Sequence, residues 1–270
     1  MILEKTVDLI KSIYKYHRII PPKINRVVIG LGYTAVEVYA LSFDPFLGLS
    51  YTLSSVIQNF NCSKIDFAGS LTEMKMEEIL GWAYEPPSLK KIIGIATLNA
   101  LSQHILEILN PYKMLKVDII EFLKINKDTK LTFIGLIKPL IQEISKITES
   151  ITIIENNIPK LPLFKKFTLK SHINELNEDE LPTDILFCTG TSLINNTMEG
   201  ILEKYKKIAK KIIVVGPTAS MIPDILFDYG VDIVGGMIIL NSESTLKVIQ
   251  EGGGTRIFKQ FGKKYWLKKE

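Results

Sequence analysis

Residues 184–197 have the sequence DILFCTGTSLINNT, in which a short apolar run is followed directly by a polar turn. The run 184–188 has the length and composition of a strand that is buried on both faces of a sheet. The residues after the turn, from about 193 to 209, carry a helical pattern. This stretch therefore predicts a strand–turn–helix unit.

The same order of elements is repeated along the C-terminal half of the chain. Further strands are expected at 131–134, 151–154, 211–215 and 232–239. Helices are expected at about 139–147, 221–228 and 242–250. Short apolar strands that alternate with helices indicate a parallel sheet with helices on both faces. We therefore expect an α/β fold whose C-terminal domain, residues 126–270, is a Rossmann-like parallel sheet. The segments 255–259 and 264–268 are predicted to close the chain as a hairpin around Gly262.

The N-terminal half has a different order, with strands first and long helices later. An amphipathic helix is expected at 1–17, followed by paired strands within 25–42 and a third strand at 46–53. Helices are expected at about 71–80 and 88–109. Strands followed by helices are typical of an α+β domain. We assign residues 1–125 to this smaller domain, because the polar residues 126–128 precede the alternating strands and helices of the C-terminal half.

Composition narrows the class of protein. The chain has 270 residues, of which 46% are hydrophobic and 23% charged, as in a globular protein of two domains. The net charge of +4 has no basic stripe, so we expect no nucleic-acid partner. No signal peptide or membrane span is recognised, which predicts a cytoplasmic protein. We therefore expect a small-molecule ligand as the partner. Strands of the first domain could also pair across a two-fold axis in a homodimer.

Polar residues follow the predicted parallel strands where ligands usually bind. Right-handed crossovers place every strand-to-helix turn at one edge of the sheet, and ligands bind outside that edge. The candidate ligand-binding residues in these turns are Thr189, Gly190, Thr191, Asn195, Thr197, Gly216, Pro217 and Thr218. Glycine permits close approach of backbone, while hydroxyls and amides donate hydrogen bonds. The alternative for this segment is that Ser192 or Asn196 only caps a helix.

Two further candidates lie outside these turns. Glu155 closes the second strand of the domain, 20 residues after Gly135, where a ribose-binding acid lies in dinucleotide folds. The dinucleotide fingerprint needs three glycines, and the first turn has only Gly135. Glu155 is therefore either a ligand contact or a solvated strand-end carboxylate. Asn99 lies in an apolar helix, where it either braces the interface between the domains or reaches a cleft.

Several of these stretches resemble one family. Residues 189–197, 215–218 and 230–236 are similar to the signature stretches of the putative heavy-metal chelation family, whose C-terminal domain is Rossmann-like. Residues 48–52 and 93–100 are similar to its N-terminal domain, which resembles the N-terminal part of enolase. The resemblance implies a cleft between two domains. It implies no reaction, since the role in the family's name is a conjecture.

The residues that could bind a metal directly are scattered. Soft metals prefer clusters of thiolates and imidazoles. This chain has Cys62, Cys188, His17, His104 and His172, and none of them lies close to another in sequence. We therefore expect no metal site built from protein ligands alone. A ligand that brings its own metal, such as a metal chelate, or an anionic metabolite agrees better with the polar turns.

The sequence thus predicts a small-molecule-binding protein with its site between the two domains. Whether it is an enzyme stays open, because no nucleophile–base pair is recognised. One alternative is a nucleotide- or S-adenosylmethionine-dependent transferase with an adenosine-containing cofactor, which Glu155 favours and the lone Gly135 disfavours. Another is a non-catalytic carrier or scaffold in a metal or cofactor pathway.

Overall fold

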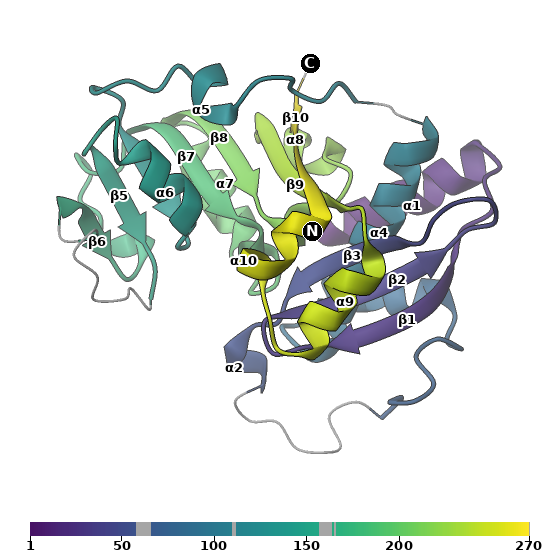
Figure 1. The fold of residues 1–270 in the computed structure, drawn as a ribbon. Coiled ribbons are helices and arrows are strands. Elements are labelled where there is room, and N and C mark those ends of the chain that lie inside the picture. The colour runs from purple at the N-terminus through teal and green to yellow at the C-terminus, as the bar shows by residue number, and fades with distance from the viewer. Residues whose placement is uncertain (58–65, 110–111, 157–163, 165, 270) are drawn as a thin grey trace.

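Two sheets organise the chain in the computed structural model, which describes residues 1–57, 66–109, 112–156, 164 and 166–269 (Figure 1). The small sheet is antiparallel, in the order β1-β2-β3, with strands β1 (Lys23–Ile29), β2 (Tyr33–Tyr39) and β3 (Phe46–Tyr51). The large sheet has the order β10-β9-β8-β7-β4-β5-β6. Its strands are β4 (Leu131–Ile134), β5 (Ile151–Ile154), β6 (Thr168–Lys170), β7 (Thr183–Thr189), β8 (Ala209–Val215), β9 (Ile233–Ile239) and β10 (Gly262–Lys268).

The large sheet has the connectivity of a Rossmann sheet. Neighbouring strands are parallel from β6 through to β9, and only β10 runs antiparallel to its neighbour. The order β6-β5-β4-β7-β8-β9 corresponds to 3-2-1-4-5-6, with the reversal between β4 and β7. The predicted fold class, a large parallel sheet with a smaller α+β unit before it, is confirmed.

Alternate residues of β7 explain why both faces of the large sheet are covered. Leu186 and Cys188 point into one core, which α1 (Ile2–Tyr16), α7 (Met198–Tyr205) and α8 (Asp224–Asp228) complete. Ile185 and Phe187 point into the other core, with α5 (Ile119–Phe122) and α6 (Lys138–Ile144). The continuous apolar run that identified this strand in the sequence is thus buried on both sides.

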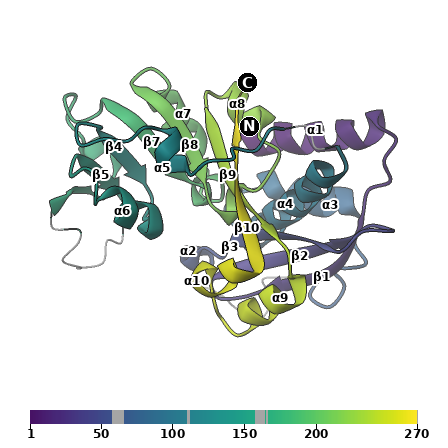
Figure 2. The same cartoon turned by 45° about the horizontal axis from the view of Figure 1, so that its top comes forward.

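The small sheet is also covered on both faces, by helices from opposite halves of the chain (Figure 2). Helices α3 (Met76–Gly81) and α4 (Leu89–Leu109) pack on one face. Helices α9 (Ser242–Gln250) and α10 (Thr255–Phe258) pack on the other. The shorter helices are α2 (Ser54–Ile57), η1 (Trp82–Tyr84), η3 (Ile173–Glu175), η4 (Gly190–Leu193), η5 (Pro217–Ala219) and η6 (Lys259–Phe261).

Helix α4 is the one described helix that is long and apolar enough to span a membrane. However, 83% of its apolar window is buried inside the structure, between the small sheet and the first helix. A helix that is apolar all round is typical of a protein core as well as of a membrane. Its position identifies α4 as a core helix.

The predicted C-terminal hairpin is wrong. Residues 255–258 form helix α10, and β10 pairs with β9 instead, with Gly262 opposite Ile239. The reason lies in the partner strand: a Cβ at Gly235 would lie 2.3 Å from the ring of Trp266. That glycine makes room for a large aromatic side chain of β10, a complementarity that local sequence patterns do not reveal.

The observed bounds of other elements also differ from the predicted ones. The helix expected at 193–209 is interrupted, because Asn196 adopts a left-handed backbone conformation with φ +61°, and α7 begins only at Met198. It ends at Tyr205, where the chain turns into β8. Strand β6 was not predicted, since three residues are too few for a recognisable pattern. Cys62 lies outside the described residues.

Candidate functional site

The carboxyl ends of the parallel strands bring several predicted site residues to one edge. Ile134 pairs with both Ile154 and Cys188, so Gly135, Glu155 and Thr189 follow neighbouring strands at the same level. Thr189 pairs in turn with Val215, which precedes Gly216. The order reversal lies within this group, between Gly135 and Thr189.

Contacts within this edge are local. Gly135 has φ +91°, and a Cβ on it would lie 2.5 Å from Thr189 Cγ2. The Thr189 hydroxyl donates to Thr191 Oγ1 at 3.3 Å and accepts from the Thr191 backbone N–H at 3.4 Å. Glu155 Oε2 accepts from the Leu136 N–H at 3.2 Å, so this carboxylate faces the first turn. The two threonines at the predicted ligand edge therefore bond within their own turn, and the acid bonds to the neighbouring first turn.

The turn at 216–220 lies against the small sheet. Thr218 is 3% exposed, and its hydroxyl accepts from the Tyr51 N–H at 3.0 Å. The fully buried Asn99 amide donates to Leu49 O at 2.7 Å, to Thr218 O at 2.9 Å and to Pro217 O at 3.3 Å. Asn99 thus connects β3 to this turn. Gly190 also packs here, because a Cβ on it would lie 2.8 Å from the Ala219 nitrogen.

The remaining predicted residues surround the start of α7. Asn195 and Thr197 are exposed, and Asn195 Oδ1 accepts from the Thr197 hydroxyl at 2.7 Å. Between them, Asn196 turns its side chain to α4, where its Oδ1 accepts from Lys91 Nζ at 2.6 Å. The alternative that Asn196 only caps a helix is wrong, because its side chain contacts a residue 105 positions away.

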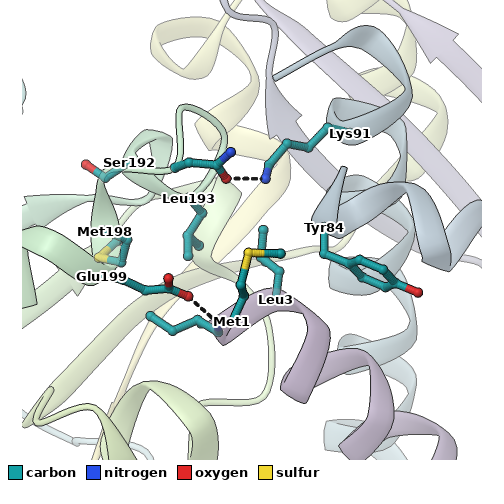
Figure 3. Close-up of a pocket in the computed structure, with 10 residues that line it drawn as sticks. Met1, Leu3, Tyr84, Lys91, Ser192, Leu193, Met198 and Glu199 are labelled. Atoms are coloured by element: carbon teal, nitrogen blue, oxygen red, sulfur yellow. Dashed lines mark hydrogen bonds between the residues drawn. The ribbon is translucent and has the colours of Figure 1, made fainter. Parts of the chain in front are cut away.

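A pocket of about 270 Å³ lies beside this contact, where the N-terminal ends of α1, α4 and α7 meet (Figure 3). We call it the Lys91 pocket. Its polar wall is formed by Lys91, Ser192, Asn196 and Glu199. The other residues that line it are Met1, Ile2, Leu3, Tyr84, Leu193 and Met198. Glu199 Oε1 accepts from the Ile2 N–H at 2.5 Å, which fixes the carboxylate at the pocket wall.

Lys91 is the most unusual group in the pocket. It is 1% exposed, and Nζ donates to Asn196 Oδ1 and to Glu85 O, the latter at 3.1 Å. Burial lowers the pKa of the Lys91 ammonium to about 8, while the negative charge of Glu199 opposes the decrease. A lysine held in this way next to a pocket is a candidate functional group.

Sequence reasoning missed Lys91 and Glu199. Lys91 opens an apolar helix beside Lys90, and two adjacent lysines give no indication of which one is buried. Glu199 lies in the first turn of a helix, where an acidic residue is common. A usable signal was the length of the apolar run after Lys91. A helix that is apolar all round is buried, and a lysine near its start is then buried with it.

The thiol and imidazole groups that the structure describes lie in separate places. Among the residues that the structure describes, no group of three or more His, Cys, Asp or Glu side chains could hold a metal ion. Burial raises the pKa of the Cys188 thiol to about 12, so this thiol stays protonated. His104 is buried against Tyr14, whose hydroxyl lies 2.8 Å from Nδ1, and His17 and His172 are exposed.

Two family models match this chain. Both carry the description putative heavy-metal chelation; one, DUF364, covers residues 118–268 and the other, DUF4213, covers residues 16–102. An uncharacterised protein of Methanocaldococcus jannaschii is 25% identical over 197 residues, which are 72% of each chain.

Solved structures of the same family share the fold. A DUF364 protein of unknown function from Pyrococcus horikoshii superposes with a TM-score of 0.77 at 22% identity, over 100% of both chains. Another, from Desulfitobacterium hafniense, gives a TM-score of 0.71 at 17% identity over 96% of this chain and 98% of that one. At these identities the likeness concerns the fold alone.

Proposed function

This chain belongs to the family described as putative heavy-metal chelation, and we propose that it binds a small polar metabolite in the Lys91 pocket. The observation that carries the proposal is the buried Lys91 side chain on the pocket wall, bonded to Asn196 in the turn before α7. Small-molecule sites combine an apolar lining with a few fixed polar groups, often between domains. Lys91 and the Asn196 amide offer donors to the ligand, and Glu199 offers an acceptor.

The size of the pocket limits the ligand. Its volume of about 270 Å³ lies just below the ~300–1,000 Å³ of typical ligand sites. At roughly 30 Å³ for each water molecule, it holds the equivalent of about nine waters. This favours an anionic metabolite with on the order of ten non-hydrogen atoms over a large chelate such as a tetrapyrrole. Because the described residues supply no metal cluster, a metal would arrive bound to the ligand's own donors.

Native mass spectrometry of gently purified protein, with metal analysis of the same sample, tests this proposal. The wild type is compared with Lys91→Met, which keeps the length of the side chain without its nitrogen. Lys90→Met is the matched control, because Lys90 is on the same helix and lies over the rings of Phe67 and Trp82. We expect a bound small mass in the wild type and in Lys90→Met that is lost in Lys91→Met. Equal occupancy in all three proteins would contradict the proposal.

A second candidate ligand is an adenosine-containing cofactor at the carboxyl edge of the large sheet. The strand order 3-2-1-4-5-6 and the position of Glu155 after the second strand favour it. Thermal-shift measurements with S-adenosylmethionine and with NAD test it. We expect stabilisation by one of them in the wild type and less in Glu155→Gln, which keeps an oxygen for the Leu136 N–H. The lack of any shift would favour the Lys91 pocket alone.

The same purified protein distinguishes an enzyme from a carrier. If the ligand that co-purifies returns unchanged after incubation, the non-catalytic carrier alternative gains support.

A further inference from the structure

We propose that Lys91 is a nucleophile that forms an imine with a carbonyl group of the ligand, and that the ligand class is a small aldehyde or ketone acid. This inference rests on the proposed function, since it needs a ligand in the Lys91 pocket. It goes further because it assigns covalent chemistry to one nitrogen atom.

The hydrogen bonds of Lys91 agree with a neutral amine. A lysine ammonium has three N–H donors, and a neutral amine has two donors and a lone pair. Within the described part of the chain, Lys91 Nζ has two acceptors, Asn196 Oδ1 at 2.6 Å and Glu85 O at 3.1 Å. A neutral amine would therefore have both donors satisfied, with its lone pair in the remaining tetrahedral position. In the ammonium form a third N–H takes that position.

The lowered pKa of Lys91 also favours a neutral amine. Burial lowers the pKa of Lys91 to about 8, against the opposing charge of Glu199 on α7. At pH 7 roughly a tenth of a group with this pKa is neutral, compared with less than about a thousandth of an ordinary lysine. Lysines that form Schiff bases are activated in this way, by desolvation next to the site.

The proposed step is balanced without an oxidant or reductant. The lone pair of Nζ forms a bond to the carbonyl carbon, and the carbonyl π electrons move to oxygen, which takes up a proton. Loss of water then breaks the carbon–oxygen bond and forms the C=N bond of a protonated imine. One amine hydrogen leaves with the water, and the remaining N–H still has Asn196 Oδ1 as its acceptor. Solvent in the pocket exchanges the protons, and Glu199 lines the same pocket with its carboxylate bonded to the Ile2 N–H (Figure 3).

The test is reductive trapping of the intact protein with glyoxylate or pyruvate and sodium borohydride, followed by peptide mass spectrometry. Formaldehyde with cyanoborohydride serves as a second probe that requires no particular ligand shape. We expect Lys91 to be modified at pH 7 at least about tenfold faster than Lys90, because the lowered pKa of Lys91 leaves more of its amine neutral. Lys91→Arg should lose this adduct, and Lys90→Arg should keep it.

Two outcomes would overturn the inference. One is modification of exposed lysines with none at Lys91 by either probe. The other is the same adduct yield at this peptide after Lys91→Arg. Native mass spectrometry of the unreduced samples separates the two proposals. Ligand binding that depends on Lys91 but gives no adduct would leave the pocket function standing and remove the imine; absence of both would remove both.

Discussion

Lys91 Nζ and Asn196 Oδ1 lie 2.6 Å apart although 105 residues separate them in the chain. The bond connects the beginning of the long core helix α4 to the left-handed residue that precedes α7. It therefore joins the two halves of the polar pocket wall, and it requires an unfavourable backbone conformation at Asn196. Strained backbone conformations occur mainly at functional sites, so this contact supports a functional role of the pocket.

Substitutions of Asn196 should separate backbone strain from the side-chain contact. Asn196→Gly removes the bond but tolerates φ +61°, so we expect a loss of about 0.5–2 kcal/mol in the free energy of unfolding. Asn196→Ala also removes the bond but, unlike Gly, keeps a Cβ in the left-handed region without the polar side chain by which Asn tolerates it, which should cost about 1 kcal/mol more. Urea denaturation measures both. Equal stabilities of the two variants would show that the backbone at this position is not constrained.

The pKa of Lys91 predicts a pH-dependent effect of Lys91→Met. The folded pKa of about 8 lies below the ordinary lysine value of 10.5, so the unfolded state binds more protons between these pH values. The Lys91 contribution to stability therefore rises as pH increases from 8 to 10.5. Wild type and Lys90→Met, which both keep Lys91, should gain stability relative to Lys91→Met between pH 7 and pH 10. Urea unfolding of all three proteins at both pH values is the measurement.

The close approach of Gly135 to Thr189 should make the first turn sensitive to one methyl group. Gly135→Ala combines φ +91° with a Cβ 2.5 Å from Thr189 Cγ2, and we expect a loss of about 2 kcal/mol or more. Thr189→Ser in the same chain removes that methyl and should restore part of the loss. Gly216→Ala is the control, since φ is +127° there but the surrounding space is open. Thermal unfolding of the single and double variants would reveal whether the two residues are coupled.

The interface between the sheets should depend on Asn99. Asn99→Ala leaves Leu49 O and Thr218 O without their buried donor, and we expect a loss of about 2–4 kcal/mol. Thr97→Val is a matched control on the same buried helix, because the Thr97 hydroxyl bonds only to Ile93 O one turn earlier. Guanidinium denaturation should show a much smaller effect for the control. Similar losses for both would mean that the helix, and not the Asn99 bridge, limits stability.

The sequence predicted the large sheet well because its strands are buried on both faces. The runs at 131–134 and 151–154 are the observed strands β4 and β5, and β7 extends the predicted run by a residue at each end. Continuous apolar segments between turns are recognised as buried strands with little ambiguity in their bounds. The prediction of a C-terminal hairpin was wrong because β10 pairs with β9, where Gly235 leaves room for the Trp266 side chain.

The candidate site was predicted only in part, for a similar reason. Polar turns are recognised in sequence, and they do lie at one edge of the sheet. However, sequence alone does not show that Thr218 is buried against Tyr51 or that Asn196 meets Lys91. Contacts between residues about a hundred or more positions apart depend on the relative placement of two sheets. No local pattern encodes that placement.

The most direct test of the Lys91 pocket is a crystal structure of protein purified gently and without chelators. We expect ordered non-protein density in the pocket, within hydrogen-bond distance of Lys91, Asn196 or Glu199. Water alone in this pocket, together with ligand density at the sheet edge beside Gly135 and Gly216, would contradict it and would favour the adenosine-containing cofactor.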